Sequence, residues 1–318
     1  MHGFYRGLKT LSSPKKINLM NYKKKIPTNM KKSLIILSLS LLIFAPTFAQ
    51  ADASEPEYDI FTTSILVENQ TVTSPYKGML ELQILHRFSL IENIKDLYGI
   101  YGAANSKIGL NYGVTDRIMV GVGTSKYYKL QDINWKYAIL RQTTDNSMPI
   151  SLSYFGNMVI DARPDNSFGP SESYKFIHRF SYFTQFILAR KFSEKLSLQI
   201  APSAIYFNSV PRYYANNIET GYKNFNLGLN MGGRYKVRHN HALMLEYDQL
   251  LTKQDGLSDA EKPKPNLTFG WEIGTPTHAF QIFITNYSNV INQYNFLYNQ
   301  NDFSDGKYLF GFNIIARF

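Results

Sequence analysis

After residue 60, apolar and polar residues alternate with a period of two, and no helical period of 3.6 persists. The clearest case is the stretch 225–237, where large apolar residues alternate with Asn, Gly, Arg and Lys. Such alternation predicts strands that have one apolar and one polar face. The segments with this pattern are 79–88, 106–114, 117–127, 132–142, 149–160, 177–191, 195–206, 223–237, 241–250, 266–274, 278–287 and 307–318.

The lengths of these segments and of their connections indicate the fold class. Strands of soluble proteins usually have about five or six residues, whereas a tilted strand that crosses a bilayer needs about 9–11. Most of the segments reach or exceed that length, and short connections such as 115–116 alternate with long ones such as 161–176 and 251–265. We therefore expect an all-β fold: a transmembrane antiparallel up-and-down β-barrel of about twelve strands, with short periplasmic turns and long extracellular loops.

The last segment has a further feature of membrane barrels. Its apolar face includes Phe310, Phe312, Ile314, Ala316 and the final residue Phe318. A terminal aromatic residue with apolar residues at alternate positions before it is similar to the signal that the barrel assembly machinery recognises during insertion. The alternative is an ordinary amphipathic C-terminal strand.

The beginning of the chain predicts export. Lys31 and Lys32 precede the apolar run 34–44, and small residues follow at 45–51, which is the pattern of a secretory signal peptide. The run is too short for a spanning helix, which needs about 20 residues. We expect residues 1–51 to be a basic leader and signal peptide whose true start is Met30, residues 52–77 an N-terminal periplasmic segment, and residues 78–318 the barrel. The expected location is the cell outer membrane.

Composition then removes several classes of protein. The formal net charge is +10, but residues 1–51 hold nine of the 34 Lys and Arg and no acid, which leaves 25 basic and 24 acidic residues in the remainder. The remainder is close to neutral, so its net charge gives no support for nucleic-acid binding. The chain has no cysteine, so disulfides, thiolate metal sites and cysteine nucleophiles are excluded. We expect no cofactor and no metal site.

Several stretches resemble a family of membrane-bound β-barrels of Gram-negative bacteria that is classified as a domain of unknown function. The resemblance is carried by residues 86–88, 108–117, 120–123 and 135–142, and it spans roughly residues 60–318. Ser89 departs from the family pattern, in which a glycine is expected. The resemblance implies an outer-membrane β-barrel and implies no activity.

The strand faces suggest what the interior contains. Apolar side chains such as Leu110, Val120 and Trp135 are assigned to lipid, and charged and amide side chains to the lumen. Because basic residues outnumber acidic ones on the second face, we expect a hydrated, mildly basic lumen. The charged residues expected to line a pore are Arg87, Lys107, Arg117, Lys136, Arg179, Arg234, Lys236, Glu246, Asp248 and Glu272.

Three functions remain open at this point. The first is a porin-like passive pore or small-solute channel, in which Arg87 and Arg179 form a basic constriction unless they pair with carboxylates such as Asp248. The second is a plugged barrel that binds a partner or acts as a scaffold through its loops or its N-terminal segment. A lipid-active enzyme is the third and is not favoured, because His86 and His178 are each followed after three positions by a Ser that points to the opposite strand face. The expected partners are outer-membrane lipids, the assembly machinery and small solutes.

Overall fold

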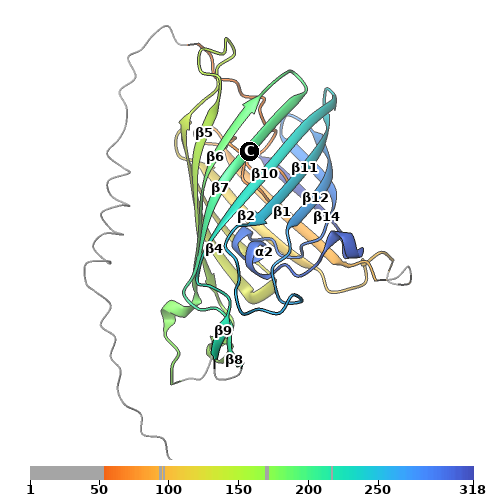
Figure 1. Cartoon of the computed structure of the whole chain (residues 1–318). Helices are drawn as coiled ribbons and strands as arrows, with labels where there is room; N and C mark the ends of the chain where they lie inside the picture. Colours follow the sequence, from red (N-terminus) through yellow and green to blue (C-terminus); the bar gives the residue numbers. More distant parts are fainter. Residues whose placement is uncertain (1–53, 93–94, 96, 169–171, 216–217) are drawn as a thin grey trace, which may run out of the picture. The chain divides into compact units, whose positions relative to one another are not determined.

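The computed structural model describes residues 54–92, 95, 97–168, 172–215 and 218–318, in which twelve antiparallel strands close into a barrel (Figure 1). Neighbours in sequence are neighbours in the wall, except that β10 follows β7, and β14 pairs with β1 to close the ring. The strands of the wall are β1 (Leu80–Leu90), β2 (Asn105–Gly113), β3 (Ile118–Ser125), β4 (Leu130–Leu140), β5 (Ser151–Asp161), β6 (Phe180–Lys191), β7 (Leu196–Phe207), β10 (Phe225–Arg238), β11 (His241–Leu250), β12 (Asn266–Gly274), β13 (His278–Thr285) and β14 (Leu309–Arg317).

The expected fold class is confirmed. Each of the twelve predicted segments coincides with a strand, and no boundary differs by more than three residues. The short turns lie at the upper end of the barrel in Figure 1 and the long connections at the lower end. By the usual orientation of bacterial outer-membrane barrels, the short turns face the periplasm and the long connections face the exterior.

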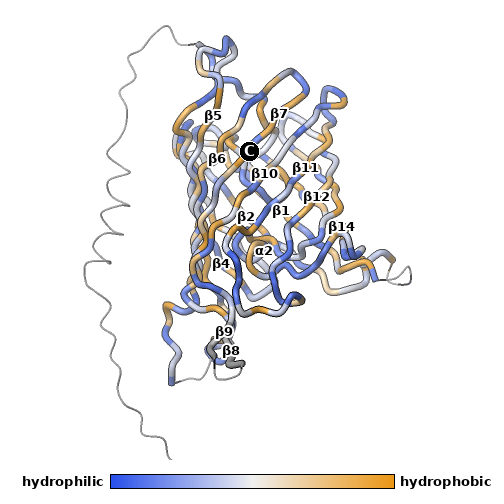
Figure 2. Tube along the Cα trace, in the orientation of Figure 1, coloured by the Kyte–Doolittle hydropathy of each residue, from blue (hydrophilic) through white to orange (hydrophobic). Residues whose placement is uncertain are grey.

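Hydrophobic and hydrophilic residues alternate along the strands of the wall (Figure 2), and the large apolar side chains are exposed on its outer surface, as the alternation predicted. Outward side chains of neighbouring strands pair directly, for example Leu110 with Val122 and Val120 with Trp135. The side chains between them point inward and are buried. Such a surface is stable only against hydrocarbon, because water would contact a continuous apolar band around the barrel.

The long connections contain structure that the sequence pattern did not predict. The connection between β7 and β10 holds a two-stranded hairpin, β8 (Arg212–Ala215) with β9 (Ile218–Gly221). The connection between β13 and β14 holds the helix α2 (Asn292–Tyr298), whose first six residues are buried. Single turns of 3-10 helix are η2 (Tyr127–Lys129), η3 (Asp165–Phe168), η4 (Phe176–Arg179) and η5 (Phe303–Asp305). No helix in the described part of the chain is long and apolar enough to cross a membrane.

The N-terminal segment is where the structure corrects the expected domain organisation. We expected residues 52–77 to be a periplasmic segment, but residues 60–73 pack against inward side chains of the wall, and Ile60, Phe61, Leu66 and Val67 are buried there. The leader and signal peptide predicted for residues 1–51 lie outside the described residues. The interior of the barrel therefore holds two segments that are not wall strands, namely residues 60–73 and the helix α2.

Candidate functional site: the occluded lumen

Residues 60–73 form a tight reversal inside the barrel, which we call the plug hairpin. The Leu66 amide donates a hydrogen bond to the Asn69 carbonyl (2.8 Å), and the Thr71 amide donates to the Ser64 carbonyl (2.9 Å). Thr63 and Thr71 add side-chain bonds to the backbone within the reversal. The plug hairpin thus satisfies part of its own backbone, and the wall must supply the remaining partners because this region is buried.

Glu246 on β11 supplies several of those partners. Its carboxylate accepts hydrogen bonds from the backbone amides of Val67 (2.8 Å), Asn69 (2.9 Å) and Glu68 (3.2 Å), and from the Tyr287 hydroxyl (3.1 Å). Successive amides that converge on one anion form the backbone arrangement known as a nest. Bonds to an ionised acceptor are about twice as strong as neutral ones, so Glu246 is the main anchor of the turn.

A second anchor surrounds Asn69. Its side-chain amide donates to Asp248 (2.7 Å) and accepts from Asn230 (2.7 Å), which also donates to Asp248 (2.9 Å). All three side chains are at most 3% exposed. A closed set of buried partners of this kind fixes the register of the turn, because a shift would leave several polar groups unpaired.

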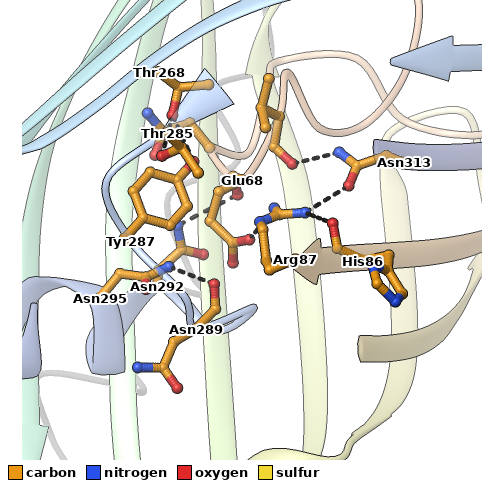
Figure 3. Close-up of polar contacts among 12 residues, drawn as sticks. Glu68, His86, Arg87, Thr268, Thr285, Tyr287, Asn289, Asn292, Asn295 and Asn313 are labelled. Carbon is orange, nitrogen blue, oxygen red and sulfur yellow. Dashed lines mark hydrogen bonds and ion pairs between the residues drawn. The ribbon is translucent and has the colours of Figure 1, made fainter. Parts of the chain in front are cut away.

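Arg87 on β1 contacts both the plug hairpin and the wall (Figure 3). Its guanidinium forms an ion pair with Glu68 of the plug hairpin (3.0 Å) and donates to Asn313 on β14 (2.9 Å). The ring of Phe283 lies 4.5 Å from the guanidinium carbon, which is a cation–π distance. Arg87 is fully buried, so it forms part of the closure and does not line a basic constriction.

Other wall residues hold the two arms of the plug hairpin. Lys136 on β4 donates to the carbonyls of Ser64 (2.9 Å) and Thr73 (3.0 Å), one on each arm. Glu272 on β12 accepts from Thr62 (2.5 Å) and pairs with Arg234 on β10 (2.9 Å). Lys236 pairs with Asp59 just before the hairpin. Because β4 and β12 lie on opposite sides of the ring, the plug hairpin spans the lumen.

The external half of the lumen is filled by α2. Its Tyr294, Phe296 and Leu297 pack with inward apolar side chains of three neighbouring strands, namely Phe155 and Val159 of β5, Phe183 and Ile187 of β6, and Ala201, Ile205 and Phe207 of β7. The wall makes room at Gly228 on β10, where a Cβ would lie 2.6 Å from the Phe296 ring. Burial raises the pKa of the Tyr298 phenol at the end of α2, so that group stays neutral.

The two segments meet inside the barrel. Asn292 of α2 donates a hydrogen bond to the Glu68 carbonyl of the plug hairpin (3.3 Å; Figure 3). The polar cavity between them has a volume of about 20 Å³ and is lined by residues such as Gln83, Lys107 and Gln293. That volume has room for about one water molecule. In this conformation the lumen is closed.

The predicted pore-lining residues divide into two groups. Eight of the ten point into the lumen, where they bond to the plug hairpin, to its flanks or to other wall side chains: Arg87, Lys107, Lys136, Arg234, Lys236, Glu246, Asp248 and Glu272. Two predictions are wrong. Arg117 is exposed in the turn after β2 and donates to carbonyls at 138 and 139, and Arg179 belongs to η4, where it bonds Tyr174 and pairs with Asp165.

The expected mildly basic lumen is also wrong. The buried charged side chains of the described residues are seven carboxylates and three basic groups, namely Glu68, Glu81, Asp132, Asp161, Glu246, Asp248 and Glu272 against Arg87, Lys136 and Arg234. Partly buried basic residues pair with members of this set, as Lys107 does with Asp132 (3.0 Å) and Arg317 with Glu81 (3.2 Å). The lumen is close to charge balance.

Four residues that matter here were missed. Glu68 and Asn69 lie before the first predicted strand, where no alternation marks them, and Tyr287 was counted in a strand and given no role. Asp132 begins a predicted strand segment, and its polar character at an inward position was the signal that could have identified it.

The histidines of the repeated His-Arg-Phe-Ser motif do not form a catalytic pair with serine. His86 stacks on Phe312 on the outer surface (4.9 Å between ring centroids), and Ser89 donates to the Gly99 carbonyl. His178 belongs to η4 and accepts from the Lys175 amide, so its predicted place on a strand is wrong. No group of three or more His, Asp or Glu side chains among the residues described is placed to hold a metal ion.

Comparison with known proteins identifies the type of domain. The sequence profile of the family described as membrane-bound beta barrel domain (DUF5777) matches residues 61–318, which include the plug hairpin from Phe61 onward. No curated protein sequence matches this chain.

Solved structures with a similar trace are outer-membrane barrels. The NanC porin shares 8% sequence identity, with 74% of this chain and 98% of that chain covered and a TM-score of 0.48. An outer membrane channel from Pseudomonas putida F1 shares 11% identity over 77% and 97% of the two chains, also with a TM-score of 0.48. The KdgM porin shares 6% identity over 75% and 99%, with a TM-score of 0.43.

Proposed function

Because the chain belongs to the DUF5777 family of membrane-bound β-barrel domains, we propose that it is a small-solute channel of the outer membrane whose lumen is held closed from within. The observation that supports the proposal is the origin of the material that fills the barrel. The blocking groups belong to the plug hairpin, which precedes the first strand, and to α2, which lies in the connection between β13 and β14, and neither is part of the wall.

A twelve-stranded wall is wide enough for this arrangement. Barrels of about eight strands are filled by their own inward side chains, and the interior widens as strands are added. Here inward side chains of β1, β4 and β11 bond to the plug hairpin, which occupies the space between them. Displacement of the plug hairpin would uncover amide and charged side chains of the wall, which suit polar solutes, and displacement of α2 would uncover the apolar side chains of β5, β6 and β7.

The character of the bonds favours a closure that can be released. Many contacts of the plug hairpin with the wall are hydrogen bonds and ion pairs, which water can replace one by one once the hairpin moves. Its apolar contacts are those of Ile60, Phe61, Leu66 and Val67 with Ala189, Met244 and Phe283, and of Ile65 with Leu85 and Ile315. No reaction is assigned to the protein.

Conductance in planar bilayers tests the proposal. The wild-type barrel is expected to show low conductance with rare openings. A variant that lacks residues 55–73, and a second in which residues 290–299 are replaced by a flexible Gly-Ser linker, are expected to open more often, and their combination most of all. If the combined variant folds, as judged by its heat-modifiable mobility in gels, and conducts no ions, the channel function is refuted and the plugged binding barrel becomes the better explanation.

A further inference from the structure

Outside the lumen, the wall carries a groove on its lipid-facing surface. The groove has a volume of about 580 Å³ and crosses β6, β7, β10 and β11. Its floor and sides include Leu188, Leu198, Ile200, Met231 and Leu245. Ligand pockets in proteins commonly measure about 300–1,000 Å³, so this groove is large enough for a substantial apolar group.

The groove exists because one outward position lacks a side chain. Arg190, Leu198, Gly233 and Leu245 are direct cross-strand neighbours and form one outward row on four strands. The next row toward the membrane centre includes Leu188, Ile200 and Met231. The missing side chain at Gly233 interrupts an otherwise continuous ridge and leaves the depression between its neighbours.

One end of the groove carries a positive charge, the guanidinium of Arg190. Arg190 lines the groove next to the last residue of β6, at the end of the barrel where the short turns lie. Its Nε is enclosed and has no hydrogen-bond partner in the described part of the chain. The ring of Phe192 lies 5.2 Å from the guanidinium carbon and holds the group against the wall. A shielded guanidinium donor without an acceptor is costly unless a ligand supplies one.

We propose that this groove is a binding site for one phospholipid of the periplasmic leaflet, with an acyl chain in the groove and the phosphate on Arg190. The depth of the groove in the membrane fits a phospholipid. Arg190 lies near the strand end, where lipid headgroups are found, and the apolar residues extend from there toward the bilayer centre. The charges match, because a guanidinium binds phosphate through two parallel N–H donors. The site lies on the outer surface and is independent of the proposed channel.

Native mass spectrometry of the full barrel, released from detergent and titrated with phosphatidylglycerol, tests the site. The wild type is expected to retain one lipid after excess lipid is removed by collisional activation. Arg190→Gln should weaken retention about tenfold, because it removes a charge-assisted contact. Gly233→Leu should weaken it as well, because the added side chain fills the groove while leaving the charge in place.

Two matched variants serve as controls. Arg238→Gln removes the same charge from an exposed position at the same end of the barrel, and Val122→Leu enlarges an outward side chain on a distant strand. Both should retain lipid as the wild type does. Equal retention in Arg190→Gln and wild type, equal loss in Arg190→Gln and Arg238→Gln, or a dimer of this chain in place of the lipid adduct would overturn the proposal.

Discussion

Glu246→Gln should release the plug hairpin while leaving the barrel intact. The substitution keeps the size of the side chain but removes its charge, so the three bonds from the amides of residues 67–69 become ordinary neutral ones. Hydrogen bonds to charged groups contribute about 1.5–3 kcal/mol each, and neutral ones about half as much. The combined loss is roughly 3 kcal/mol, which corresponds to an increase of about 100-fold in the released population.

Thiol labelling measures that population directly, because the chain has no cysteine of its own. Val67 is fully buried in the plug hairpin, so Val67→Cys should react slowly with a membrane-impermeant thiol reagent in the wild-type background. In the Glu246→Gln background the rate should rise by about 100-fold. Glu194→Gln, at a side chain that is 90% exposed, is the charge-matched control and should leave the rate unchanged. An equal labelling rate in all three backgrounds would refute the role assigned to Glu246.

Three further predictions concern assembly, the lipid face and α2. Phe318→Ser should lower the amount of barrel in the outer membrane, and unchanged levels in fractionation blots would contradict the proposed assembly signal. Ile282→Arg places a charge at an outward position that is 61% exposed to lipid, so it should destabilise the barrel by about 2–4 kcal/mol more than Ile282→Ala, measured as urea midpoints in vesicles. Gly228→Val should displace Phe296 and speed the labelling of Leu297→Cys, whereas Gly109→Ala, whose Cβ meets ordinary contact distances, should not.

The strands of the wall could be predicted from the sequence because the polarity of each residue depends only on whether its side chain faces lipid or the lumen. A strand between lipid and lumen must alternate apolar and polar side chains. The polarity of residues such as Leu227, Leu229 and Asn230 therefore predicts which face of the strand each one occupies. The alternation of short and long connections then orders the strands, and closure follows because an open sheet edge has no partner in hydrocarbon. The predicted strand faces and boundaries agree with the structure for the same reason.

The contents of the lumen could not be predicted in the same way. The plug hairpin is irregular, and its partners lie from 17 to 255 positions away in sequence, as for Ser64 with Glu81 and Thr62 with Arg317. The inward Phe155 and Phe183 indicated a filled interior, but nothing in their spacing identified the short helix α2 as the filler. The strand pattern predicts which way a charged side chain points but not its partner. Arg87 was therefore predicted to line a pore, although it forms an ion pair with Glu68 of the plug hairpin.

The plug hairpin also crosses the seam where the cylinder closes. On the β1 side, Ser64 bonds Glu81 and Glu68 pairs with Arg87; on the β14 side, the carbonyls of Thr62 and Val67 accept from Arg317 and Asn313. These partners lie at opposite ends of the barrel sequence, so the docking surface exists only after the first and last strands have joined. The segment that leaves the ribosome before every strand is therefore the last to dock. Once docked, the plug hairpin is bonded to both β1 and β14, so these bonds must break before the two strands can separate.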